Sequence, residues 1–421
     1  MELDLNGVLG ILTAEGGPTS HTAILSRGLH IPALVGVTGL LDTAHEDDRI
    51  IVDGLGGCVL FGPDEGDLAL YTARRDEYTA WESHTRLTAH WPAEMCDGVR
   101  VDVQANLESP EELDSLAECG ADGVGLYRTE FAYLRGDLPT EEELFKEYAA
   151  VTAKAAPSRV VFRTLDAGAD KMLRSQAALK EPNPALGLRG IRFCLRHQGI
   201  FRTQLRALLR AGVTGNVALL LPMISGLAEV QGVRRILQEL RQELQAQNLA
   251  HAPDLPLGIM VETPAAVLVC DALARECDFF SIGTNDLIHY LMAIDRNNRH
   301  VSYLHEPLHP AVVRSLKRVI DAAHREGIGV SVCGELASDP CGLALLLGMG
   351  VDAVSAAPRF VPGMKHMIRQ LNAETCVELA HSVLMSTDVM ASKRMVREKL
   401  HQSLGPELAF HTTSLSSHSQ P

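Results

Sequence analysis

The chain has 421 residues, of which 46% are apolar and 5% aromatic, and its formal net charge is -15. An acidic surface repels a phosphate backbone, so this charge argues against nonspecific binding to nucleic acid. The sequence has no evident signal peptide and no apolar run long enough to insert into a membrane. Its nine cysteines form no C-x-x-C pair, which argues against a zinc site or a disulfide framework. We therefore expect a cytoplasmic globular protein of two or three domains.

The first distinctive segment is Gly-Gly-Pro-Thr-Ser-His-Thr-Ala at residues 16–23. Its glycines permit a tight turn, and its hydroxyl residues suit the N-cap of the apolar helix that follows. His21 is thus predicted in the first turn of a helix, where free backbone N–H groups and the helix dipole favour a negative group. A neutral imidazole there is able to act as a nucleophile and carry a phosphoryl group. A loop histidine beside an N-cap is the alternative interpretation.

Short apolar runs separated by glycines occupy residues 1–70 and predict a small sheet layer with one helix after His21. A core of about seventy residues is marginal for independent stability. A charged helical segment follows, and we predict a linker helix at 71–98. At the other end of the chain, helices are predicted at 376–405. The segment 406–421 is rich in Ser, Thr and His and predicts a disordered tail.

Between these parts, residues 99–375 alternate short β-prone runs with amphipathic helical runs, which is typical of βα units in a parallel sheet. Eight such strands are the number that a closed (β/α)₈ barrel requires. A doubly wound sheet is the alternative, but no G-x-G-x-x-G motif stands at a first βα turn to support it. The predicted strands are Val101–Gln104, Gly123–Leu126, Val160–Phe162, Ala218–Leu221, Gly258–Val261, Phe279–Ile282, Val330–Cys333 and Asp352–Ser355.

Charged and polar residues follow the predicted strands at the ends where barrel enzymes place their active sites. Any one of them is compatible with a structural salt bridge, but their joint occurrence favours a site. These residues are Asn106, Arg128, Glu130, Arg163, Asp166, Glu262, Asn285, Asp286, Cys333 and Glu335.

The residue types at these positions suggest a particular chemistry. Guanidinium groups suit phosphate and carboxylate, and Arg189 and Arg296 are expected to join the arginines at the strand ends. The hard oxygen ligands of Glu262 and Asp286 suit one Mg²⁺ that keeps its other positions for substrate and water. The thiol of Cys333 would donate a proton. A small, multiply anionic substrate fits such a site, and the phosphorylated enol of a 2-oxo acid has the required groups.

Simpler interpretations exist for two of these residues. Arg189 is compatible with a role as a cap of the helix predicted at Leu188–Leu195. Cys333 is compatible with a role as a small core residue. Glu262 is harder to explain structurally, because a carboxylate after the apolar run Leu257–Val261 needs a partner when it is buried.

The chain resembles enzyme I of the phosphoenolpyruvate:sugar phosphotransferase system, within the wider group of phosphoenolpyruvate-utilising enzymes. The resemblance extends from Leu5 to about Leu400 and is specific, because seven motifs match in order. Their residues are 16–23 (GGPTSHTA), 125–131 (GLYRTEF), 162–166 (FRTLD), 183–189 (NPALGLR), 258–266 (GIMVETPAA), 278–287 (DFFSIGTNDL) and 333–337 (CGELA).

The resemblance implies a reaction and a role for each site residue. His21, in a small, truncated β/α phosphohistidine domain, would attack the phosphorus of phosphoenolpyruvate, and Cys333 would protonate the departing enolate to give pyruvate. The phosphoryl group would then pass to a histidine of the carrier protein HPr, and the barrel would form a homodimer. Binding would fall to three sets of residues: Mg²⁺ on Glu262 and Asp286, the substrate anions on Arg128, Arg163, Arg189 and Arg296, and the phosphate positioned by Asn285.

The chain differs from the family at its front end. Enzyme I proteins carry a helical HPr-binding domain before the phosphohistidine segment, whereas only twenty residues precede His21 here. We therefore expect a fragment of a longer protein, or a missing part supplied by another chain. Parents of the nitrogen type, or fusions with carrier or sugar-specific domains, are open alternatives.

A second function is also open at this stage: a dimeric regulatory protein that binds phosphoenolpyruvate or pyruvate without relaying phosphate. Pyruvate phosphate dikinase and phosphoenolpyruvate synthase also combine a phosphoryl-accepting histidine with a barrel site. They need an ATP-binding domain, and no Gly-rich phosphate loop with a lysine is evident in the sequence.

Overall fold

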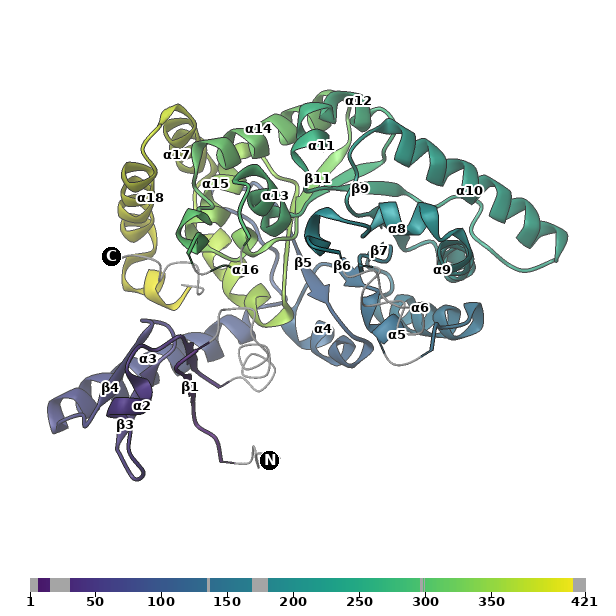
Figure 1. Cartoon of the computed structure of the whole chain (residues 1–421). Coiled ribbons are helices and arrows are strands. Elements are labelled where there is room, and N and C mark those ends of the chain that lie inside the picture. Colours follow the sequence, from purple (N-terminus) through teal and green to yellow (C-terminus); the bar gives the residue numbers. More distant parts are fainter. Residues whose placement is uncertain are drawn as a thin grey trace.

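Eight parallel strands close into a barrel at the centre of the molecule (Figure 1). The computed structural model describes residues 7–15, 31–134, 137–168, 181–295, 298 and 300–411. Strands follow one another around the barrel in chain order, and the last pairs with the first. The predicted (β/α)₈ barrel is confirmed, and each predicted strand overlaps one of these eight: β5 (Asp102–Leu107), β6 (Val124–Arg128), β7 (Val160–Arg163), β8 (Val217–Leu221), β9 (Leu257–Val261), β10 (Phe279–Ile282), β11 (Gly329–Val332) and β12 (Ala353–Ala356).

Helices surround the barrel, and several begin at side-chain caps that the sequence encodes. At the start of α6, Thr140 accepts the N–H of Glu143, whose carboxylate accepts the N–H of Thr140 in return. The α-helices are α4 (Leu113–Cys119), α5 (Glu130–Leu134), α6 (Glu141–Ala155), α8 (Ile191–Arg196), α9 (Gln198–Ala211), α10 (Leu227–Ala246), α11 (Pro264–Leu268), α12 (Cys270–Ala274), α13 (Thr284–Leu291), α14 (Pro310–Arg325), α15 (Pro340–Met349) and α16 (Val361–Gln370). Short 3₁₀ turns are η1 (Pro110–Glu112), η2 (Pro184–Leu186), η3 (Gly212–Thr214), η4 (Ser302–Leu304), η5 (Glu335–Ala337) and η6 (Pro358–Phe360). No helix in the described ranges has the length and apolar content needed to span a bilayer.

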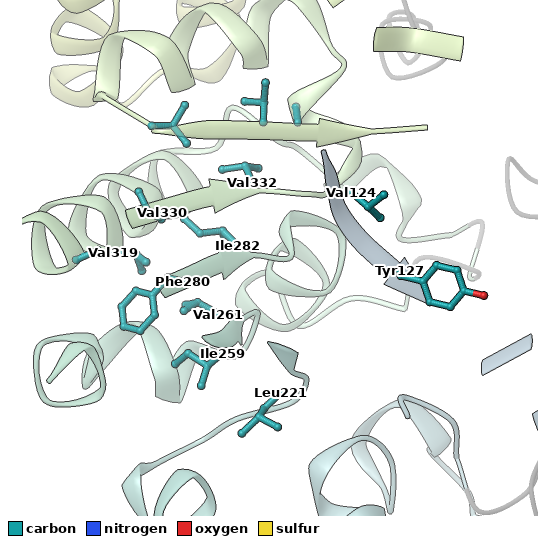
Figure 2. Packing of buried hydrophobic residues seen from close by; sticks show 14 of the residues in the cluster. Val124, Tyr127, Leu221, Ile259, Val261, Phe280, Ile282, Val319, Val330 and Val332 are labelled. Carbon is teal, nitrogen blue, oxygen red and sulfur yellow. The ribbon is translucent and has the colours of Figure 1, made fainter. Parts of the chain in front are cut away.

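Alternation along the strands divides the core into two clusters. One set of alternate side chains packs against the helices, and Figure 2 shows Ile259 and Val261 of β9 beside Phe280 and Ile282 of β10 in this outer cluster. The other set fills the barrel interior. Its members are Leu126, Val161, Ala218, Leu220, Met260 and Cys333.

The interior cluster determines which strand-end residues face the barrel axis. Successive side chains of a strand point to opposite faces, so the residue two positions after an interior side chain is directed to the interior as well. Arg128 follows Leu126, Arg163 follows Val161 and Glu262 follows Met260 in this way. The same alternation that packs the core therefore brings these charged groups together at one end of the barrel.

The front of the chain forms a small layer with little core of its own. Strands β1 (Ile11–Thr13) and β2 (Ala33–Val35) pair in parallel, and β3 (Ile50–Asp53) and β4 (Cys58–Phe61) pair antiparallel. Every residue of these four strands is only half-buried. The short helix α2 (Leu40–Thr43) lies between the two pairs in the sequence.

Helix α3 (Glu65–Leu87) joins this layer to the barrel, and in Figure 1 its far end reaches the barrel beside α16. It starts earlier than the linker helix predicted at 71–98, because Asp64 and Asp67 form a reciprocal capping box at its N-terminus.

The C-terminal part contains helices α17 (Ala373–Met385) and α18 (Val389–Leu404), followed by the 3₁₀ helix η7 (Gly405–Phe410). The prediction of a disordered tail from Pro406 is therefore wrong for Pro406–Phe410. Ring contacts with α3 explain their order: Phe410 lies 5.8 Å from Trp81 and 5.9 Å from Tyr78, measured between ring centroids.

We call this packing the C-terminal clamp, formed by Glu407, Phe410 and His411 against α3 and α16. The ring of His411 stands edge-on to Trp81 at 4.9 Å. Glu407 accepts hydrogen bonds from His366 at 3.0 Å and from Gln370 at 3.1 Å. Burial, helped by the nearby His366, lowers the pKa of His411 to about 4. The clamp thus favours a neutral imidazole at its centre.

We expect the clamp to weaken in acid. The folded pKa of His411 lies below its unfolded value, so its stabilising effect is complete above about pH 6.5 and is lost as the pH falls toward 4. In the variant H411F, the free energy of unfolding should change less between pH 7 and 4 than in the wild type, by up to about 3 kcal/mol. Urea unfolding between pH 7 and 4, followed by Trp81 fluorescence in a W91F background, measures the difference. Equal pH dependence in the two proteins would contradict the expectation.

Candidate active site

Seven of the nine predicted site residues lie in the described part of the chain, and all seven stand at the carboxyl end of the barrel. Barrel enzymes carry their active sites at this end. His21 and Arg296 lie outside the described residues. The seven are Arg128 and Arg163 at the last positions of β6 and β7, Arg189 just before α8, Glu262 directly after β9, Asn285 and Asp286 in the first turn of α13, and Cys333 directly after β11.

Asp166 organises two of the arginines. Its carboxylate, only 2% exposed, accepts Nε and Nη2 of Arg189 at 3.2 and 2.8 Å and pairs with Nη1 of Arg163 at 3.2 Å. Glu130 accepts Nη2 of Arg163 at 3.1 Å and the N–H of Asp166 at 2.8 Å. Nη2 of Arg189 also meets Oδ2 of Asp286 at 3.2 Å. The result is a continuous ionic chain from β7 to α13.

The loop that carries Arg189 is fixed at two points. Gly190 has φ +56°, and an added Cβ would lie 2.8 Å from the side chain of Met223, so the position favours glycine. The hydroxyl of Tyr290 donates to the carbonyl of Ala185 at 2.5 Å and accepts from Nη1 of Arg189 at 3.3 Å. The guanidinium of Arg189 is thus held within the site, and the interpretation as a simple helix cap does not describe it.

Glu262 is a buried carboxylate, 1% exposed, whose Oε1 accepts the N–H of Met223 at 2.6 Å. The backbone of Met223 has φ +59°, an uncommon conformation for this residue type. Burial, together with the negative charges of Asp166 and Asp286, raises the pKa of Glu262. Several carboxylates therefore crowd one small volume, and an added cation there would stabilise their ionised forms.

The acidic residues suit the Mg²⁺ expected from the sequence. Among the described residues, no group of three or more His, Cys, Asp and Glu side chains is placed to hold an ion. Mg²⁺, however, is often held by only one or two carboxylates and completes its shell with water and substrate phosphates. Glu262 and Asp286 provide such hard oxygen donors, and their mutual repulsion is what a cation would relieve.

Cys333 belongs to the interior cluster and borders the charged layer. Its N–H donates to the carbonyl of Ile282 at 3.1 Å, and its carbonyl accepts from the amide of Asn106 at 3.0 Å. Burial raises the pKa of the thiol, against the opposing influence of the Ser281 hydroxyl and of Arg163. Cys333 is thus kept as a protonated thiol, the form that a proton donor needs. The burial of Cys333 fits the core interpretation, and its role as a proton donor stays a prediction.

The segment after Cys333 is tied to α13. Oδ1 of Asn285 accepts the N–H of Glu335 at 2.9 Å. A Cβ on Gly334 would approach the hydroxyl of Thr284 to 1.9 Å, so only glycine allows this close contact. Asn285 therefore fixes the backbone beside the thiol.

Two arginines at this end have unused hydrogen-bonding capacity. Nε of Arg128 and Nε of Arg163 are buried without a hydrogen-bond partner in the described structure. Arg128 pairs with Glu108 through Nη1, and its side chain remains 39% exposed. Unsatisfied guanidinium groups at the open end of a barrel are well suited to receive an anion.

Three residues that support the site were not predicted from the sequence. Tyr290 stands one helical turn after Asp286 and so shares its face of α13, a spacing that would have indicated it. Ser281 lies on β10 between Phe280 and Ile282, whose side chains pack in the outer cluster. Alternation along the strand therefore directs Ser281 to the barrel interior. Gly190 has no signal in a single sequence, because its conformation depends on Asp166 and Met223, which are distant in the chain.

Arginines and buried carboxylates at the carboxyl end of a barrel are typical of enzymes that bind small anions. Comparison with known proteins gives the family. Residues 82–373 match the PEP-binding domain of PEP-utilising enzymes, and residues 1–57 match the mobile domain of the same enzymes. The chain belongs to the PEP-utilising enzyme family.

Two relatives illustrate the similarity. The phosphoenolpyruvate-protein phosphotransferase of Bacillus sp. (strain S) is 44% identical over 384 residues, which is 91% of this chain and 66% of the relative. That of Staphylococcus aureus (strain MRSA252) is 43% identical over 381 residues, 90% of this chain and 67% of the relative. The chain thus spans about two thirds of their length.

Among solved structures, a citrate lyase from Burkholderia xenovorans LB400 is similar with a TM-score of 0.40 and 16% identity. The match covers 74% of this chain and 95% of that chain. Likeness of this degree carries no conclusion about the site.

We expect Y290F to weaken the binding of phosphoenolpyruvate about fivefold. The substitution removes the hydroxyl that links Arg189 to the carbonyl of Ala185, and one lost hydrogen bond costs about 1 kcal/mol. Isothermal titration calorimetry in the presence of Mg²⁺ measures the dissociation constant. Tyr303 is 72% exposed, so Y303F is the matched control and should bind as the wild type does. Equal affinity of both variants would show that Tyr290 does not support Arg189.

Proposed function

We propose that this chain catalyses phosphoryl transfer from phosphoenolpyruvate to its own His21, releases pyruvate, and passes the phosphoryl group to a histidine of an HPr-type carrier protein. The observation that carries the proposal is the joint presence of the arginine chain, the buried carboxylates and the protonated Cys333 at one end of the barrel. The names of the relatives support the same activity.

The arginines suit the two anionic groups of phosphoenolpyruvate. Guanidinium forks bind phosphate and carboxylate through paired hydrogen bonds, and Arg128 and Arg163 have buried N–H groups without partners. Arg189 is fixed by Asp166, so it would meet the substrate in a preorganised position. Arg296 is proposed to join them on the basis of its sequence position alone.

Glu262 and Asp286 would hold Mg²⁺, which supplies charge neutralisation for the phosphate and carboxylate when it is bound. Asn285 would position the phosphate next to this pair. Binding of the cation and of the anionic substrate should be mutually favourable, because the carboxylates repel one another in the absence of a cation.

The reaction needs a nucleophile for phosphorus and a proton for carbon. A ring nitrogen of His21 would form the new N–P bond while the P–O bond to the enol oxygen breaks and leaves its electron pair on that oxygen. As the enolate becomes the ketone of pyruvate, its methylene carbon would take the proton of Cys333, which is left as thiolate. The role of His21 rests on its motif and on the match of residues 1–57 to a mobile domain.

We propose further that the protein works in the cytoplasm and forms a homodimer through the barrel. A second candidate is a regulatory protein that binds phosphoenolpyruvate or pyruvate without relaying phosphate. The observation in its favour is that every described site residue belongs to the barrel part of the chain, which would suffice for binding alone.

Labelling distinguishes the two candidates. With [³²P]phosphoenolpyruvate and Mg²⁺, we expect acid-labile label on the protein, because phosphohistidine hydrolyses in acid, and we expect none in H21A. His45 is highly exposed, so H45A is the control and should be labelled normally. Pyruvate binding without any label in the wild type would favour the regulatory protein.

Substitution of Cys333 tests its proposed role as the proton donor. C333A should slow phosphoenolpyruvate turnover by about 10²–10⁴-fold, the usual effect of a lost general acid, while substrate affinity changes little. The control C277A replaces a thiol that is also 6% exposed but precedes β10, at the opposite end of the barrel. Steady-state release of pyruvate measures both. Unchanged turnover in C333A would show that the role of Cys333 is purely structural.

A further inference from the structure

We propose that Ser281 is a positioning residue for Cys333, and that its hydroxyl orients the thiol toward the substrate and stabilises the thiolate left after proton transfer. The inference rests on the proposed function, since it concerns the proton-donating step. Its basis is a contact in the barrel interior between Cys333 and Ser281, a residue that the sequence did not indicate as part of the site.

The contact is direct and fully enclosed. Ser281, with 0% exposure, lies on β10 next to β11, and its Oγ donates to Sγ of Cys333 at 3.3 Å. The strands are in register, with Ile282 opposite Val332, so the position of Cys333 follows from the pairing. Ser281 and Cys333 therefore meet because of the sheet geometry and not through a loop.

The side chain of Cys333 depends on this hydroxyl for its orientation. The backbone is held by Ile282 at the N–H and by Asn106 at the carbonyl, as described above. Sγ donates to the carbonyl of Ile282 at 3.7 Å and accepts from the hydroxyl of Ser281 at 3.3 Å. The other members of the interior cluster are apolar. Among the described residues, Ser281 is thus the side chain that donates a hydrogen bond to the thiol, and it helps to determine where the thiol points.

The contact should strengthen as the proton leaves. A neutral thiol is a weak acceptor, whereas a thiolate is charged, and hydrogen bonds to charged groups are about twice as strong as neutral ones. A group that binds the product of a step better than its starting form lowers the barrier to that step. In a buried site this difference is larger than in water, and the nearby Arg163 favours the thiolate in the same direction.

The neighbouring strand offers a matched control. Ser331 is the register partner of Ser281, but its Oγ donates to the carbonyl of Phe280 at 3.4 Å. It belongs to the same layer of the barrel and has the same chemistry. Any effect of removing a serine hydroxyl from this layer in general should therefore appear in S331A as well.

The test uses the reverse of the proton-transfer step. If Cys333 protonates the enolate, its thiolate must also be able to remove a proton from the methyl group of bound pyruvate, so the chain should exchange pyruvate protons for deuterium in D₂O. NMR spectroscopy with Mg²⁺ present follows this exchange and does not require phosphate relay through His21. Varying the pyruvate concentration gives the maximal rate and the apparent KM separately.

We expect S281A to lower the maximal exchange rate about tenfold with an unchanged KM, which corresponds to the loss of one charge-assisted hydrogen bond. S331A should behave as the wild type does. A purely structural role of Ser281 would instead raise the KM or lower the midpoint of urea unfolding, and either result without a change in maximal rate overturns the inference. Equal maximal rates in S281A and S331A overturn it too. Exchange at the wild-type rate in C333A would refute the proton-donor assignment itself, and so the two failures are distinguishable.

Discussion

The buried carboxylate of Asp166 is the interaction on which the candidate site depends. It binds Arg163 from the end of β7 and Arg189 from the segment before α8, and Arg189 continues to Asp286 on α13. Removing one partner from a buried ionic group leaves the others uncompensated, which is far more costly than losing an exposed pair. The position of both arginines and the position of α13 are therefore energetically coupled through one side chain that does not itself need to touch the substrate.

This network also shapes what the site is able to bind. Five carboxylates, those of Glu108, Glu130, Asp166, Glu262 and Asp286, stand near the guanidinium groups of Arg128, Arg163 and Arg189 in the described part of the chain. An anion entering alone gains from the arginines but is opposed by the acidic residues. An anion that enters with a divalent cation satisfies both sets at once. Burial, together with Asp166 and Asp286, raises the pKa of Glu262, so a cation beside it would favour its ionised form.

The fold and most of the site were predictable because both follow from local patterns. Apolar runs spaced by helices gave the eight strands, and strand ends gave Arg163, Glu262 and Cys333. The contacts that support these residues were not predictable, because they join parts of the chain that are distant in sequence. Tyr290 and Ala185 are 105 positions apart, and Ser281 and Cys333 are 52 positions apart. The same limitation explains the error at the C-terminus. Phe410 is ordered by aromatic rings of α3, more than three hundred residues earlier in the chain, and no pattern in the tail itself indicates such contacts.

Helix α13 links the two halves of the proposed chemistry. Its residue Asp286 meets Arg189, and Asn285 accepts the N–H of Glu335, two residues after Cys333. The close contact between Thr284 and Gly334 packs the first turn of α13 directly against the segment that follows Cys333. The two ends of the ionic and hydrogen-bonding network are therefore joined by one helical turn, which carries Asp286 toward Arg189 and Asn285 toward Glu335.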